Sequence, residues 1–264
     1  KPNLAEAYSN LGIILKEIGK LKEAEISTLK SIEINPDSAT SYSNLGGILI
    51  YSKRFEEACT YYQKAIKLNP NSTSAKLGLI ECNTFLCDWT NNKLHQEWIQ
   101  NIGIEGLPVP TLSLLYLEDN PLRQLSRAAN LYKKLYKRKA KKISLVKKNK
   151  IHIGYFSSDF RAHPTMYLIS NILALHDKSR FNVFLYSFPP VEDEYTKKAK
   201  NSGCIYRNIK DLNNIEAVNL ARKDELDIAI DLMGYIKYNR MELFSHRVAP
   251  IQINYLGYPG SLGS

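Results

Sequence analysis

One segment of this chain repeats itself at a fixed interval. Residues 5–36 (AEAYSNLGIILKEIGKLKEAEISTLKSIEINP) align with residues 39–70 (ATSYSNLGGILIYSKRFEEACTYYQKAIKLNP) at a constant spacing of 34 residues. The coinciding positions carry small, polar and apolar side chains: Tyr8/Tyr42, Asn10/Asn44, Leu11/Leu45, Gly12/Gly46, Ala24/Ala58 and Pro36/Pro70. A unit of this length cannot bury its apolar face alone, so it has to stack on a neighbour.

A period of 34 residues is that of tetratricopeptide (TPR) repeats, in which each unit is a pair of helices. Gly12 and Ala24 are small enough to let the two helices approach closely, and Pro36 ends the second helix. A third unit begins at Thr73 but keeps little of the pattern, and we expect it to cap the stack. The sequence therefore predicts an α-solenoid with its capping helices over residues 1–98.

Asn10 and Asn44 occupy equivalent places in the first helices of the two repeats, which line the concave groove of such a solenoid. A carboxamide can donate to and accept from a peptide backbone at once, so a ladder of asparagines could hold an extended peptide. The alternative is that this asparagine is common in such helices and is simply solvated. The residues alone do not decide between these interpretations.

The pattern changes after the helical region. From Ile151 on, β-rich runs (151–156, 181–187, 226–234 and 250–258) alternate with candidate helices (near 164–176, 193–202 and 213–224). Nearly continuous apolar strands that alternate with helices are typical of a parallel sheet covered on both faces. We predict a Rossmann-like lobe over residues 150–264, joined to the solenoid by a helical linker over residues 99–149 in which a helix starts at Asn120.

Polar residues and loop formers gather where the predicted strands end. They are Ser157, Ser158, Asp159 and His163 after the first strand, and Pro189, Pro190, Gly234, Tyr235, Lys237, Tyr258, Pro259 and Gly260 after the others. Because ligands bind beyond the carboxyl ends of parallel strands, these loops predict one crevice. A structural role remains the alternative for each, such as a turn cap for Asp159.

The sequence argues against common cofactors. Neither GxGxxG nor GxxxxGK[ST] occurs, so a dinucleotide site or a P-loop is not predicted. The five histidines are scattered and form no Cys/His cluster, so we expect no metal. No apolar run approaches the roughly 20 residues of a membrane helix. Four cysteines without a CxxC pair are most simply explained by a reducing cytoplasm.

The net charge of +10 has a single origin. Residues 133–150 (KKLYKRKAKKISLVKKNK) hold ten basic residues and no acidic one, while the rest of the chain is balanced. Such a run can bind the phosphates of nucleic acid or lipid. It can also be a solvated helix end and linker, which we favour because clustered like charges usually avoid a core.

Several motifs together resemble a known family. They are CDW (87–89), IGYFSSDFRAHP (153–164), FNVFLYS (181–187), DLMGY (231–235) and RMELFSHRVAPIQINYLGYPG (240–260). After a TPR array, this series resembles the TPR-containing O-linked N-acetylglucosamine transferases and their bacterial relatives. The resemblance implies an inverting enzyme of the two-lobed GT-B kind. It would take N-acetylglucosamine from UDP-GlcNAc without a metal cofactor and bind its acceptor proteins through the TPR groove.

The resemblance also assigns site residues. The aspartate and histidine of the family's DFxxHP motif fall on Asp159 and His163, both active-site groups in that family. The loop that approaches the sugar falls on Leu256, Gly257, Tyr258, Pro259 and Gly260.

This chain departs from the animal enzymes in having PVPTLSLLY at residues 108–116, where they have a histidine-rich stretch. The second, nucleotide-binding lobe would follow Ser264, so we expect residues 1–264 to be inactive alone. The alternative function is a non-catalytic TPR scaffold that binds peptides, although this leaves the loops of the lobe unexplained.

Overall fold

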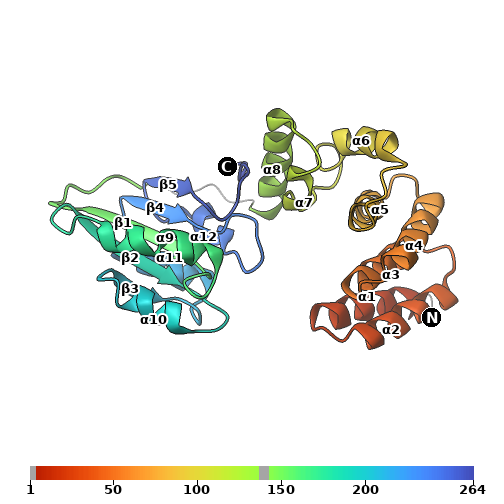
Figure 1. Ribbon diagram of the computed structural model, residues 1–264, viewed down its shortest axis with the longest axis horizontal. Helices are drawn as coiled ribbons and strands as arrows, with labels where there is room; N and C mark the ends of the chain where they lie inside the picture. The colour runs from red at the N-terminus through yellow and green to blue at the C-terminus, as the bar shows by residue number, and fades with distance from the viewer. Residues whose placement is uncertain (1–3, 137–142) are drawn as a thin grey trace. The chain divides into compact units, whose positions relative to one another are not determined.

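The computed structural model describes residues 4–136 and 143–264, which form two compact units, Lys1–Val109 and Pro110–Ser264 (Figure 1). The predicted linker over residues 99–149 is divided between these two units. Within the basic segment, residues 137–142 lie outside the described residues.

The described part of the first unit contains two helix pairs and two further helices, labelled in Figure 1. The pairs are α1 (Leu4–Glu17) with α2 (Leu21–Ile34) and α3 (Ala39–Tyr51) with α4 (Phe55–Leu68), and α5 (Thr73–Phe85) and α6 (Asn92–Asn101) follow them. Ser38 and Ser72 cap α3 and α5 at equivalent places, accepting hydrogen bonds from amides three residues on. The two predicted repeats are thus present, and a helix begins at Thr73 as expected. The capping role of this third unit stays a prediction.

Small residues let the paired helices touch, as predicted. A Cβ atom added to Gly12 would lie 2.1 Å from Oγ1 of Thr28 on the partner helix, and Ala24 is fully buried. The ring of Tyr62 in α4 lies between Gly46 of α3 and Gly78 of α5, where an added Cβ would meet the ring at 2.8 Å and 2.2 Å. The repeat is therefore stabilised by close packing at these glycines.

The second unit contains a five-stranded parallel sheet in the order β3-β2-β1-β4-β5. The strands are β1 (Ile151–Ser157), β2 (Phe181–Ser187), β3 (Ile205–Asn208), β4 (Ile228–Asp231) and β5 (Ile251–Asn254). The helices of this unit are α7 (Leu112–Leu115), α8 (Pro121–Leu135), α9 (Pro164–Leu175), α10 (Glu194–Lys200), α11 (Asn214–Lys223) and α12 (Met241–Ser245). The predicted fold class, a TPR solenoid followed by a Rossmann-like parallel sheet, is confirmed.

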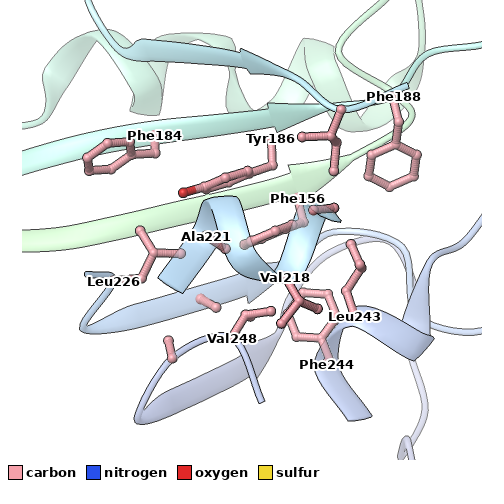
Figure 2. Packing of buried hydrophobic residues seen from close by; sticks show 14 of the residues in the cluster. Phe156, Phe184, Tyr186, Phe188, Val218, Ala221, Leu226, Leu243, Phe244 and Val248 are labelled. Atoms are coloured by element: carbon pink, nitrogen blue, oxygen red, sulfur yellow. The ribbon is translucent and has the colours of Figure 1, made fainter. Parts of the chain in front are cut away.

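Each face of the sheet packs against helices. On one face, Phe156 stacks on Tyr186 at 4.2 Å between ring centroids and meets the edge of Phe244 of α12 at 5.2 Å. Figure 2 shows this cluster, with Val218 and Ala221 of α11 packed beneath the strands. On the other face, a second buried cluster joins β1 and β2 to α9 and α10, including Tyr155, Leu185, Ile169, Leu173 and Ala199. Alternate residues of β1 thus serve opposite faces.

The sequence missed one strand and one helix of the sheet domain. β3 has four residues (IYRN), which are exposed or half-buried because the strand lies at the edge, so it lacks an apolar run. α12 is a single short turn of helix. The predicted helix start at Asn120 is confirmed, since its side chain caps α8 by accepting from the amide of Arg123 at 3.0 Å.

Helix α6, the last described helix of the first unit, contains a buried histidine. His95 is 5% exposed, its ring lies beside that of Trp98 at 5.6 Å between centroids, and its Nε2 lies 3.5 Å from Nδ2 of Asn83. Burial lowers the pKa of His95 below its usual value of 6.5. The folded unit therefore prefers the neutral ring. In the unfolded chain, by contrast, His95 binds a proton once the pH falls below 6.5.

We expect the first unit to lose stability as the pH falls from 6.5 through the lower folded pKa of His95. The measurement is urea unfolding followed by tryptophan fluorescence at several pH values, because both tryptophans, Trp89 and Trp98, lie in this unit. His95→Gln should remove this part of the pH dependence. An unchanged pH dependence in that variant would rule His95 out as its source.

Candidate functional site

Backbone hydrogen bonds join the loops at the carboxyl edge of the sheet to the ends of neighbouring strands. The amide of Phe188, just after β2, donates to the carbonyl of Ser157 at 3.2 Å. The amide of Leu232, just after β4, donates to Phe156 at 3.1 Å, and the amide of Tyr255, just after β5, donates to Asp231 at 2.9 Å. The four predicted loops therefore lie at one edge, as parallel pairing requires.

The loop after β1 is built around its two serines. Ser157 Oγ accepts a hydrogen bond from the amide of Asp159 at 2.9 Å, which turns the chain sharply. The hydroxyls of Ser157 and Ser158 also lie 3.4 Å and 3.5 Å from the sulfur of Met233, in the loop after β4. The paired serines thus fix the position of Asp159, which is 3% exposed.

Asp159 and His163 face each other across this loop. His163 Nδ1 lies 3.5 Å from Asp159 Oδ2, and Arg161 donates to Asp159 Oδ1 at 3.1 Å. His163 also caps α9, because its Nδ1 accepts from the amide of Thr165 at 3.2 Å. In this arrangement a neutral ring carries its hydrogen on Nε2, because Nδ1 is the acceptor. The loop thus places an imidazole and a carboxylate within 3.5 Å of each other.

The loop after β5 packs closely on the loop after β4. A Cβ atom on Gly257 would lie 1.8 Å from the carbonyl oxygen of Leu232, and one on Gly234, where φ is +59°, would lie 2.3 Å from Cβ of Tyr258. Of the predicted sugar-loop residues, Leu256 and Pro259 are exposed, whereas Gly257 and Gly260 are half-buried. At Gly234 and Gly257, only glycine fits between the two loops.

Tyr258 lies inside the unit, away from solvent. It is 3% exposed, its ring meets Tyr235 edge-on at 5.8 Å between centroids, and its hydroxyl lies 2.5 Å from Oγ1 of the buried Thr111. Thr111 belongs to the PVPTLSLLY segment, so this segment anchors the predicted sugar loop. Sequence reasoning missed this pairing, because 147 residues separate the two side chains.

A second buried carboxylate at this edge was also missed. Asp231 ends β4, is 3% exposed, and accepts hydrogen bonds from the amides of Met233 at 3.0 Å and Gly234 at 2.8 Å. Burial raises its pKa to about 6, against the opposing effect of the two amides. It borders a cavity of about 290 Å³ that Tyr132 and Asn254 also line.

The two asparagines of the TPR repeats have different surroundings. Asn44 is half-buried and donates from Nδ2 to Oγ of Ser9 at 2.8 Å, whereas Asn10 is exposed. The predicted peptide ladder stays a prediction, with Asn44 already partly engaged by the neighbouring repeat.

Residues 4–136 and 143–264 contain no group of three or more His, Cys, Asp or Glu side chains arranged to bind a metal ion. Within the same ranges, no helix combines the length and the apolar character needed to cross a membrane. The absence of a metal cofactor stays a prediction.

A TPR solenoid joined to a Rossmann-like lobe with a DFxxHP loop defines the class of TPR-linked glycosyltransferases. The model of glycosyl transferase family 41 matches residues 123–264, more than half of the chain, so this chain belongs to that family. Models of the tetratricopeptide repeat match residues 5–38 and 39–72. The resemblance found in the sequence is confirmed.

Individual relatives agree with the family. The UDP-N-acetylglucosamine--peptide N-acetylglucosaminyltransferase of Caenorhabditis elegans is 36% identical over 128 residues, 47% of this chain and 11% of that protein. The probable enzyme SEC of Arabidopsis thaliana is 29% identical over 116 residues, 44% of this chain and 12% of that protein. The solved Thermobaculum terrenum O-GlcNAc transferase mutant K341M matches with a TM-score of 0.52 and 24% identity, over 97% of this chain and 44% of that one, which supports the fold. The chain thus spans less than half the length of these proteins.

We predict that the hydrogen bond between Thr111 and Tyr258 stabilises the second unit. Thr111→Val and Tyr258→Phe should each lower the free energy of unfolding by about 1–2 kcal/mol. Each variant removes one hydroxyl of the pair and leaves the other one buried without this hydrogen bond. The double variant should cost little more than either single one. Hydrogen exchange of amides in β4 and β5 measures this, and additive effects would show that the two hydroxyls act independently.

Proposed function

We propose that this chain carries the acceptor-binding repeats and the first catalytic lobe of a protein O-glycosyltransferase. The reaction transfers N-acetylglucosamine from UDP-GlcNAc to serine or threonine hydroxyls of proteins. The observation that supports this most directly is the Asp159–His163 pair, 3.5 Å apart on a loop that the loops after β2 and β4 contact, in a chain of glycosyl transferase family 41.

The chemistry suits these residues. In an inverting transfer, the acceptor hydroxyl oxygen attacks the anomeric carbon, the bond from that carbon to the phosphate oxygen breaks, and UDP leaves with the electron pair. The hydroxyl proton has to be taken up, and a positioned base or relay typically contributes about 10²–10⁴-fold. Asp159 and His163 can hold this proton between them, and the exposed Leu256 and Pro259 can contact the sugar.

The leaving diphosphate sets a further requirement. It needs fixed N–H donors or cations, which usually make the largest electrostatic contribution to catalysis. Arg161, the cation of the first loop, is already paired with Asp159. We therefore assign diphosphate binding to a second lobe and infer that residues 1–264 alone do not transfer sugar.

Protein acceptors are the proposed partners of the repeats, since TPR units commonly present a concave surface to peptides. We propose a cytoplasmic setting, which fits the free thiols of all four cysteines. A pure scaffold would explain the repeats but not the joined loops. Nucleic-acid binding is disfavoured because Lys148 pairs with Asp227 at 3.2 Å and Lys150 donates to the carbonyl of Lys178 at 2.6 Å.

In the full-length protein, His163→Ala should lower sugar transfer to protein acceptors by about 10²-fold or more, with the fold intact, because its side chain lies at a partly exposed loop edge. The assay follows labelled sugar from UDP-GlcNAc into an acceptor protein. His246→Ala, at the end of α12 and outside the four loops, is the matched control. Full activity of His163→Ala would remove this histidine from the mechanism.

Replacing Asn10 and Asn44 with alanine should weaken capture of unstructured acceptor segments while circular dichroism shows unchanged helicity. Ser9→Ala is the control, because it removes only the contact that Asn44 makes with its neighbour. Equal peptide affinity in the double variant and the native protein would reject the asparagine ladder.

A further inference from the structure

One side chain of the loop after β2, that of Asp193, forms a hydrogen bond with the backbone of the loop after β1. Asp193 caps α10, where its Oδ1 accepts from the amides of Tyr195 at 2.9 Å and Thr196 at 3.0 Å. Its other oxygen, Oδ2, accepts from the amide of Ala162 at 2.6 Å. One carboxylate thus binds its own helix and a backbone group 31 residues earlier in the chain.

The position of that backbone group is significant. Ala162 is the residue before His163, and it has no side-chain polar group that could anchor this part of the loop. On one side, Arg161 is held by Asp159; on the other, the His163 ring is held by the amide of Thr165. The bond from Ala162 to Asp193 therefore fixes the remaining backbone between the carboxylate and the imidazole of the site.

The strength of this contact follows from its charge. A carboxylate that accepts backbone N–H groups forms shorter and stronger hydrogen bonds than a neutral acceptor does. Burial acts to raise the pKa of Asp193, but its backbone and side-chain hydrogen-bond donors outweigh that effect and hold the pKa below its usual value. Asp193 accordingly stays ionised at neutral pH.

We propose that Asp193 is a positioning residue, which holds the Ala162 backbone and thereby sets His163 against Asp159 for proton uptake. This inference rests on the proposed function of the site. It adds a contribution from the second loop, in which sequence reasoning singled out only Pro189 and Pro190.

Two variants separate this contact from the helix cap. Asp193→Asn keeps a good capping residue, because asparagine caps helices as well as aspartate does, but it turns an N–H₂ group toward the N–H of Ala162. Thr196→Ala is the matched control. It removes the hydroxyl that accepts from the Asp193 amide at 3.2 Å and so breaks the reciprocal cap, while Asp193 Oδ2 remains in place.

The first measurement is amide hydrogen exchange by NMR on residues 1–264. Exchange at Ala162 should become about tenfold or more faster in Asp193→Asn, because a hydrogen bond to a charged acceptor is roughly twice as strong as one to a neutral acceptor. Exchange at Ala162 should stay close to the native rate in Thr196→Ala. In that variant the amides of α10 should exchange faster instead. Equal exchange at Ala162 in Asp193→Asn and the native protein would overturn the proposal, whatever the protein's function.

The second measurement is sugar transfer by the full-length protein. Asp193→Asn should lower kcat about tenfold or more with little change in KM for UDP-GlcNAc, because small displacements of a reacting group are costly. Thr196→Ala should stay within about twofold. Faster Ala162 exchange with unchanged kcat would overturn the positioning role. No transfer by the native protein would instead refute the proposed function, and the exchange result would still decide whether the contact exists.

Discussion

Parallel pairing of β1 with β2 on one side and β4 on the other is the constraint on which the candidate site depends. Each of the site loops begins where a strand of this sheet ends, so the pairing alone brings Ser157, Ser187 and Asp231 to one edge. The rings of Phe156 and Tyr186 stack on each other near the carboxyl ends of β1 and β2. A change that shifts this register would separate the loops, even if each kept its local structure.

Much of this arrangement was readable from local sequence. The alternation of apolar strands with helices predicted the sheet, and the polar run after the first strand predicted the loop of Asp159 and His163. Local patterns could not find β3, whose four half-exposed residues carry no apolar run. Contacts between distant segments were equally hidden, because the partners Ala162 and Asp193, or Thr111 and Tyr258, each look ordinary in their own surroundings.

The site also keeps features that a fold alone does not need. Asp159 and Asp231 are buried carboxylates, and burial of such groups is costly unless hydrogen bonds compensate. Leu256 adopts a φ of +64°, a left-handed conformation that costs roughly 1–3 kcal/mol for a residue other than glycine. Left-handed backbone also occurs far from this edge, at Lys53 and Cys87, so it does not single out the site. The buried carboxylates are the features of this edge that fit the proposed catalytic role.

The central claim is that these loops form one half of a sugar-transfer site, whose diphosphate-binding half lies in a second lobe. The most direct test compares residues 1–264 with the full-length protein, side by side, for transfer of labelled N-acetylglucosamine from UDP-GlcNAc to a protein acceptor. We expect turnover by the full-length protein and none by residues 1–264. Robust turnover by residues 1–264 alone, or none by the full-length protein, would contradict that claim.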